Sequence, residues 1–157
     1  MDKKMFCFQC EQTVGCAGCT GNAGVCGKKA DTARLQDELT GALIGLAIAV
    51  DSTTAISKRT GQVIIEGLFT TVTNVNFDDA SIENMIQKVR AEKERLVPDC
   101  SKGQSPCGKT GEYDMQQLWN ANEDIRSLKS LILFGIRGMA AYAYHANVLN
   151  YEDTEVN

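Results

Sequence analysis

The sequence contains no apolar run long enough to cross a membrane and no apolar leader. A membrane-spanning helix needs about 18 consecutive apolar residues, whereas the longest apolar run, residues 42–50, is interrupted by Gly45 and stops at Asp51. The first residues, Met1-Asp2-Lys3-Lys4, lead almost directly into cysteine, without the hydrophobic segment of a secretory signal. We therefore predict a cytoplasmic protein that has no membrane partner.

Positive charge is also scarce. The chain has 16 Lys and Arg residues against 20 Asp and Glu residues, which gives a net charge of −4 and a pI near 5.0. A surface that binds nucleic acid or an anionic membrane usually carries a basic surplus. Gly18, Gly21 and Gly24 do not form a phosphate-binding loop, because they precede no strand-to-helix turn of the required kind. The sequence thus predicts no nucleic-acid partner.

Histidine and tryptophan each occur once. We interpret His145 as structural, because an imidazole near the C-terminal end of a helix can hydrogen-bond the last carbonyl groups. We interpret Trp119 as a residue that packs helices together. Neither side chain is predicted to take part in catalysis.

No segment shows the sustained period-two alternation of a β-strand, whereas apolar residues recur at helical spacing along most of the chain. This spacing predicts helices over residues 32–50, over a shorter stretch around 63–72, from about 80 to Pro98, and over 122–146, with polar turns at 51–60. The last helix is apolar nearly all round in its middle, which is typical of a central helix in a bundle. We predict an all-α helical bundle with short connections.

The chain has the length of one domain. We predict that residues 1–30 form a Cys/Gly-rich cluster-binding segment and that residues 31–157 form a helical bundle packing with it as one domain. Asp153 and Thr154 resemble the cap of a further helix. We therefore expect the bundle to be truncated at its C-terminus.

Cysteine is the residue that the chain has in excess, and it is concentrated near the N-terminus. Five of the seven cysteines alternate with glycines over twenty residues: Cys7, Cys10, Cys16, Cys19 and Cys26. A segment so poor in large apolar side chains needs a metal or disulfides to hold it. A reducing cytoplasm favours metal, and an odd number of cysteines cannot pair completely. A disulfide framework is the less favoured alternative.

The spacing of the cysteines allows more than one metal site. Tetrahedral zinc and iron–sulfur clusters both take four thiolates, often from C-x2-C pairs. Two such pairs are present, Cys7/Cys10 and Cys16/Cys19, and they would leave Cys26 over. Glycine N–H groups and the positive charge of Lys28-Lys29 would suit an anionic cluster. Spacing alone leaves zinc and iron–sulfur open.

Several strings resemble one known family. Met5-Phe6-Cys7-Phe8-Gln9-Cys10-Glu11-Gln12-Thr13, then Gly18-Cys19-Thr20, then Gly24-Val25-Cys26-Gly27-Lys28 resemble the N-terminal motif of the hybrid cluster proteins, or prismane proteins, which are hydroxylamine reductases. Further matches follow in the same order at residues 35–39, 71–77 and 135–142, with His145 after them. The resemblance extends along nearly the whole chain.

The resemblance implies a set of cluster ligands. Family members bind a cluster through a C-x2-C pair, a Gly-Cys cysteine and a Cys-Gly-Lys cysteine, which correspond here to Cys7, Cys10, Cys19 and Cys26. Cys16 would then be surplus. The eight-residue gap between Cys10 and Cys19 resembles members that carry [4Fe–4S], while a longer gap accompanies [2Fe–2S]. Zinc could occupy the same thiols in an aerobic preparation.

The resemblance also implies a function and partners. The family reduces hydroxylamine to ammonia and water, or reduces nitric oxide, with electrons from a reductase. Its catalytic hybrid cluster is held by later α/β domains that have no counterpart in this sequence. We therefore predict an Fe–S electron-relay portion whose partners are the catalytic hybrid-cluster domains and a reductase donor. The alternatives are a free-standing electron-transfer or redox-sensing protein, a structural zinc module, and a helical interaction protein with metal-free thiols. Cys100 and Cys107 receive no role.

Overall fold

The computed structural model describes residues 6–10, 18–51, 56–97 and 113–151. Cys16, Cys100 and Cys107 lie outside these residues. The described residues form helices and contain only isolated β-bridges, so the predicted all-α fold is confirmed. The helices are α1 (Ala30–Asp51), α2 (Lys58–Thr70), α3 (Asp79–Leu96), α4 (Met115–Trp119) and α5 (Glu123–Val148). Among the described residues no helix is both long and apolar enough to cross a membrane.

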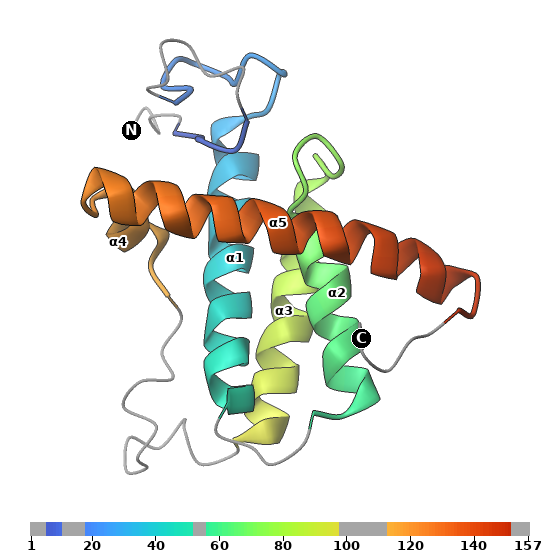
Figure 1. Ribbon diagram of the computed structural model, residues 1–157. Helices are drawn as coiled ribbons and strands as arrows, with labels where there is room; N and C mark the ends of the chain where they lie inside the picture. The colour runs from blue at the N-terminus through green and yellow to red at the C-terminus, as the bar shows by residue number, and fades with distance from the viewer. Residues whose placement is uncertain (1–5, 11–17, 52–55, 98–112, 152–157) are drawn as a thin grey trace.

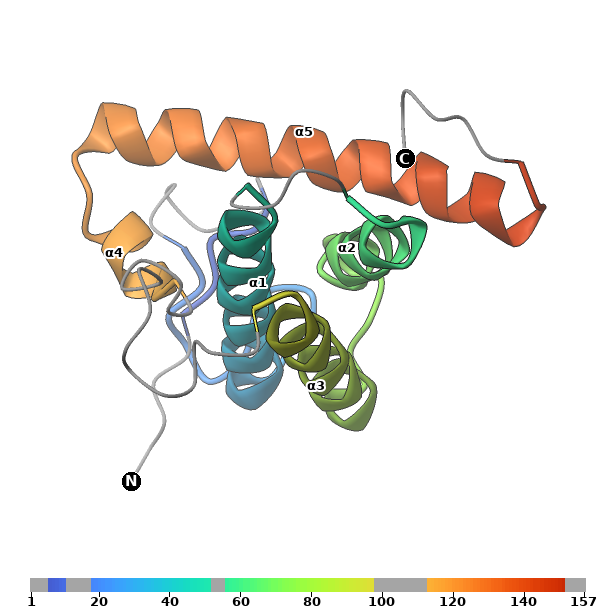
Figure 2. The ribbon, with the colours of Figure 1, turned by 90° about the horizontal axis from the view of Figure 1, so that it is seen from below.

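Three helices form an up-down bundle, and they lie roughly side by side in Figures 1 and 2. Helix α1 runs from the N-terminal loop to the far end, α2 returns, and α3 runs parallel to α1. The core between them consists of fully buried apolar side chains, which include Leu39, Leu46, Ile82, Ile86 and Val89. Burying each such side chain stabilises the fold by about 1.5–3 kcal/mol. The bundle is therefore a firm base for the N-terminal loop and for the α2–α3 connection, which lie at the same end.

The prediction that the last helix is central is wrong. Helix α5 lies across the outside of the bundle, over α1 and α2, instead of between them (Figures 1 and 2). Its buried residues are Ser130, Arg137, Ala140 and Ala143, and two of these are small enough to let α5 approach α2 closely. An all-round apolar helix normally indicates burial on all sides. Here only one side is covered, and several large apolar side chains stay exposed.

Arg137 fixes α5 to the bundle. Its guanidinium is buried, and it donates from Nε to Thr71 Oγ1 at 2.9 Å and from Nη2 to Thr40 Oγ1 at 2.9 Å. Burial lowers the pKa of Arg137 to about 10, although the nearby charge of Asp37 opposes this shift. The group stays protonated at neutral pH. A single cation thus connects α5 to α1 and to the end of α2.

The short helix α4 holds the N-terminal segment in place. Asp114 caps it by accepting from Gln116 N at 2.9 Å, and Trp119 ends it. The indole ring of Trp119 packs edge-on against Phe6 and Phe8, with ring centroids 5.6 and 6.0 Å apart. Trp119 therefore packs α4 against the N-terminal loop, whereas the sequence predicted that it packs helices together. The division of the chain at residue 30 stays a prediction.

Candidate metal centre

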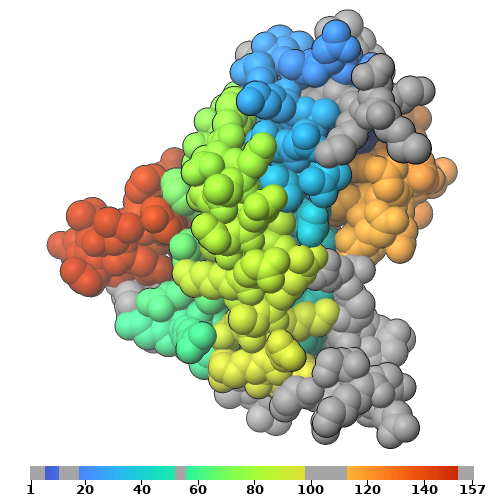
Figure 3. All heavy atoms as spheres, turned by 180° about the vertical axis from the view of Figure 1, so that it is seen from behind, coloured from blue at the N-terminus to red at the C-terminus, as the bar shows by residue number. Residues whose placement is uncertain are grey.

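The N-terminal loop brings Cys7 and Cys19 together through its backbone. The two residues exchange both main-chain hydrogen bonds, Cys7 N to Cys19 O at 3.1 Å and Cys19 N to Cys7 O at 2.7 Å. In such an antiparallel pair the two side chains lie on the same face. Two cysteines that are twelve positions apart in the sequence thus become direct neighbours. In Figure 3 this loop covers the end of the bundle beside α1.

A tight turn positions Cys26. Gly24 N donates to Lys28 O at 2.8 Å, and Gly27 N donates to Gly24 O at 2.8 Å, so the chain reverses around Cys26. Gly27 has a φ of +84°, a left-handed conformation that side chains disfavour. The glycine of the Cys-Gly-Lys string therefore has a structural role. It permits the turn that directs Lys28 back toward the loop.

All four predicted ligands line one cavity. Cys7, Cys10, Cys19 and Cys26 are free thiols, each half-buried, and they surround a space that Gln9, Lys28, Thr73 and Asn74 complete. The space is only about 10 Å³, roughly the room for one water molecule. Among the described residues no group of three or more His, Cys, Asp or Glu side chains stands ready to hold a metal ion. The donor chemistry fits a thiolate-bound cluster, and the loop would have to rearrange to hold one.

Lys28 places a buried positive charge beside the thiols. Its side chain is 2% exposed, and Nζ lies 3.8 Å from Cys7 Sγ. Nζ also donates to Gln36 Oε1 at 2.6 Å and to Gln9 Oε1 at 3.2 Å. Burial raises the pKa of the Cys7 thiol, and the charge of Lys28 opposes that rise. An ammonium held here between neutral amides would favour negative charge on the sulfurs.

The connection between α2 and α3 forms the floor of the site. Thr73 Oγ1 donates to Gln9 O at 2.8 Å, and Gln36 Nε2 donates to Asn76 O at 2.8 Å. Asn74 lines the cavity and has a left-handed φ of 63°. Residues 71–77 form one of the strings that resemble the family, and their sequence predicts no role for them. The structure shows that they hold the cysteine loop against the bundle.

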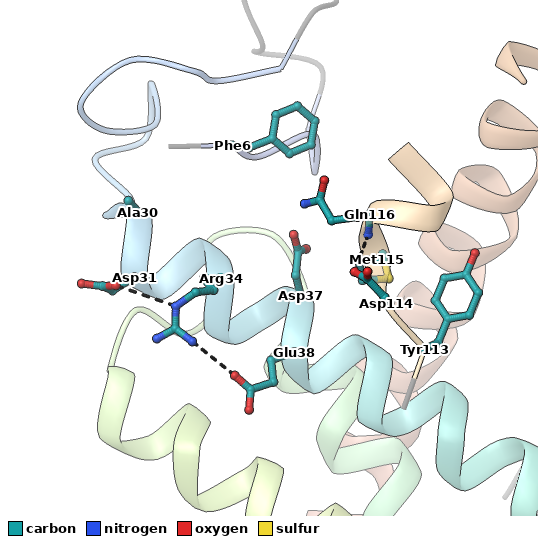
Figure 4. A pocket seen from close by; sticks show the side chains of 10 residues that line it. All are labelled: Phe6, Ala30, Asp31, Arg34, Asp37, Glu38, Tyr113, Asp114, Met115 and Gln116. Atoms are coloured by element: carbon teal, nitrogen blue, oxygen red, sulfur yellow. Dashed lines mark hydrogen bonds and ion pairs between the residues drawn. The ribbon is translucent and has the colours of Figure 1, made fainter. Parts of the chain in front are cut away.

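A larger cavity lies next to the cysteine loop, as Figure 4 shows. It has a volume of about 550 Å³ and is bordered by the start of α1 and by α4, with Asp37 on one wall and Phe6 above it. Burial raises the pKa of Asp37 to about 6, while the buried indole N–H of Trp119 and the charges of Arg137 and Lys28 lower it. The Trp119 N–H makes no hydrogen bond of normal geometry. No local sequence signal identifies Asp37, because its neighbours come from distant segments.

We expect Gly18→Ala to disturb the Cys7–Cys19 pairing. Gly18 has a φ of +86°, and an added Cβ would lie 3.1 Å from Cys7 O and 3.2 Å from the Phe6 ring. The left-handed conformation alone costs a non-glycine residue about 1–2 kcal/mol. The variant should unfold at lower urea concentration and retain less iron after anaerobic loading. Gly21→Ala is the matched control, because an added Cβ there meets only Ala23 O at 3.9 Å. Equal behaviour of the two variants would contradict the role assigned to Gly18.

We expect Asp37→Asn to stabilise the chain at pH 8. The folded pKa of Asp37 is about 6 against an ordinary value of 3.8, so the folded state binds a proton more tightly than the unfolded state. Asp37 therefore reduces stability as pH rises from about 4 to 6, and the cost stays constant above that range. The variant should gain on the order of 2 kcal/mol at pH 8 and almost nothing at pH 4. Urea unfolding at both pH values measures this, with Asp51→Asn as control, because Asp51 is an exposed carboxylate on the same helix. A gain that is equal at both pH values would contradict the assignment.

Comparison with known proteins identifies similar sequences. The family profile described as Prismane/CO dehydrogenase family matches residues 5–157. A hydroxylamine reductase of Methanococcus vannielii is 39% identical over 170 residues, covering 97% of this chain and 31% of the relative. One of Porphyromonas gingivalis is 40% identical over 177 residues, covering 100% and 32%. One of Clostridium perfringens is 38% identical over 174 residues, covering 98% and 32%. The chain thus spans about a third of the length of these relatives and aligns with their N-terminal part.

Proposed function

Because the chain belongs to the Prismane/CO dehydrogenase family, we propose that it holds an iron–sulfur cluster and relays electrons as the N-terminal part of a hydroxylamine reductase. Membership of this family implies iron–sulfur binding in general. The observation that carries the proposal is that four free thiols line one cavity beside a buried ammonium group. The finer proposal is a [4Fe–4S] cluster in a cytoplasmic protein.

The proposed ligands are Cys7, Cys10, Cys19 and Cys26. Two of them, Cys7 and Cys19, are paired through the backbone, and Cys26 lies in the turn that Gly27 permits. This pairing supports the use of Cys19. Cys16, which lies outside the described residues, is proposed as a bystander. When bound, such a cluster takes up and releases one electron at a time.

The chain's own groups would control how readily the electron is accepted. The charge of Lys28 and main-chain N–H groups near the sulfurs favour the more negative, reduced state. Gln9 and Gln36 hold Nζ in place. Phe6 and Phe8 pack on Trp119 and so join the cysteine loop to α4. The arrangement suits storage and transfer of charge.

The proposed reaction of the whole protein is the reduction of hydroxylamine to ammonia and water. The support is the name of the relatives, which are about three times as long as this chain. The proposed partners are therefore the catalytic hybrid-cluster domains of the family and a reductase that supplies electrons. The most direct competitor is a free-standing electron-transfer or redox-sensing protein built from the same fold.

The test combines electron uptake with turnover. The chain, loaded anaerobically with iron and sulfide, is titrated with a reduced viologen and then given hydroxylamine. We expect reversible reduction of the visible chromophore and no sustained formation of ammonia, because we propose that electron relay and catalysis belong to different domains of the family's proteins. Sustained ammonia formation by the loaded chain would contradict a relay role. A loaded chain that accepts no electrons would contradict the proposal that it holds a redox-active cluster.

A further inference from the structure

Asp37 lies between an open cavity and the buried side of the cysteine loop. Figure 4 shows its carboxyl group rising from α1 into the cavity of about 550 Å³. On its other side, Asp37 lines a small cavity of about 10 Å³ together with Gln9, Trp119 and Arg137. Gln9 belongs to the loop that carries the proposed cluster ligands. The carboxyl group is therefore within reach of water on one side and close to that loop on the other.

Charged and titratable groups surround Asp37 on each described element that packs against it. In α1, Arg34 lies beside it and forms ion pairs with Glu38 at 3.4 Å and with Asp31 at 3.8 Å. The remaining groups come from the cysteine loop, from the start of α4 and from α5, and they are Lys28, Cys7, Tyr113, Asp114 and Arg137. Within the part of the chain that the structure describes, none of the cations forms an ion pair with Asp37 within 4 Å, although the charges of Arg137 and Lys28 act on it. Asp37 is thus the carboxylate of this cavity whose charge is least compensated by contact.

Asp37 and the proposed ligand Cys7 influence each other electrostatically. Burial raises the pKa of the Cys7 thiol, and the negative charge of Asp37 raises it further. Burial also raises the pKa of Asp37 itself to about 6, so its carboxylate is close to protonation at neutral pH. An additional negative charge on the loop would raise the pKa of Asp37 again, because nearby like charges disfavour the ionised form.

We propose that Asp37 takes up a proton from water in the adjoining cavity when the cluster held by the cysteine loop gains an electron. The electron comes from the reductant. The proton converts the carboxylate of Asp37 to a neutral carboxyl group, so that the negative charge added to the loop is balanced. This linkage rests on the proposed function, and it makes electron uptake depend on pH.

The first test is the midpoint potential of the anaerobically loaded chain, measured by visible absorption between pH 5.5 and 9. We expect the potential to fall as the pH rises above about 6 and to level off at high pH, because the reduced form binds the proton more tightly. A tenfold difference in proton affinity between the two redox states corresponds to a total fall of about 59 mV. In Asp37→Asn the potential should not depend on pH. It should stay close to the value of the parent at pH 5.5, because the amide is neutral like the protonated carboxyl group.

Asp114→Asn is the matched control for this substitution. Asp114 lines the same cavity and is exposed, and asparagine caps a helix as well as aspartate does, so α4 should keep its start. This variant should keep the pH dependence of the parent. A pH-dependent fall of unchanged size in Asp37→Asn would overturn the proposal. An Asp37→Asn variant whose potential is higher by the same amount at every pH would also overturn it, because the carboxylate would then act only as a fixed charge.

Proton uptake on reduction gives a second measurement. Reduced methyl viologen is added to the loaded chain at pH 7 in weak buffer with a pH indicator. The parent and Asp114→Asn should each take up a fraction of a proton per electron, and Asp37→Asn should take up much less. Equal uptake by all three would overturn the proposal. A chain that holds no reducible cluster would contradict the proposed function and this linkage together, whereas a reducible cluster with a pH-independent potential would overturn the linkage alone.

Discussion

Replacing Cys19 by Ser should abolish iron retention by the anaerobically loaded chain, whereas Cys16→Ser should leave it intact. Cys19 lies directly opposite Cys7, with both main-chain hydrogen bonds formed, and it lines the cavity that all four proposed ligands share. A serine oxygen is a much poorer ligand for iron–sulfur clusters than a thiolate. Losing one of four ligands in so small a loop should therefore remove the cluster altogether.

Cys16→Ser and Cys26→Ser separate the two ligand sets that spacing alone leaves open, because Cys19 belongs to both sets. The proposed set predicts that Cys16→Ser keeps the iron and that Cys26→Ser, like Cys19→Ser, loses it. Iron per chain and visible absorption after desalting give the measurement. Loss of iron by Cys16→Ser together with retention by Cys26→Ser would show that the two C-x2-C pairs form the site and that Cys26 is the bystander.

Arg137→Met should destabilise the chain by about 3 kcal/mol at pH 8. The substitution removes two charge-assisted hydrogen bonds, to Thr40 and Thr71, both 2.9 Å long. It also removes the positive charge of Arg137, which lowers the pKa of Asp37. Because removing that cation raises the pKa of Asp37 still further, the loss should be largest above pH 6, where the carboxylate is ionised. Urea unfolding at pH 8 and pH 5 measures the difference.

Lys129→Met is the control for this prediction, since Lys129 lies on the same helix but is exposed. It should change stability by less than about 0.5 kcal/mol. Adding Asp37→Asn to Arg137→Met should restore part of the loss, because the unpaired carboxylate is then gone. An Arg137→Met variant as stable as the parent at pH 8 would mean that α5 is held by apolar contact alone.

The sequence predicts helices well where their apolar side chains build the core. It predicts them poorly where contacts with neighbouring segments set the start or the existence of a helix. Leu39, Leu46, Ile82 and Ile86 recur at helical spacing, and all are buried between α1 and α3. Helix α2 begins at Lys58, inside a stretch that the polar pattern assigned to a turn, because Ser57 caps it by accepting from Thr60 N at 3.2 Å. The five-residue helix α4 is too short to show a period.

Helix α5 shows a different limit of sequence reasoning. Its apolar spacing correctly predicts a helix, but composition cannot state which sides of that helix the rest of the fold covers. The structure shows that only the side carrying Arg137 is covered among the described residues. An apolar pattern all round a helix therefore does not by itself place that helix at the centre of a bundle.

The candidate site divides in the same way. The cysteines are visible from their spacing, and Lys28 is visible as a nearby charge. The sequence does not reveal that Lys28 is buried or that it donates a 2.6 Å hydrogen bond to Gln36, because that contact depends on where α1 begins. Thr73 and Asp37 reach the site from other parts of the bundle, and only the fold brings them there.

The most direct test of the central claim is the metal and sulfide content of the intact chain, loaded and purified anaerobically, with EPR of the reduced sample. The account predicts about four irons and four acid-labile sulfides per chain and a paramagnetic signal on reduction. Two irons with two sulfides per chain would be consistent with the proposed ligands but would indicate a [2Fe–2S] cluster in place of [4Fe–4S]. One zinc per chain, with no iron and no visible chromophore, would contradict the account.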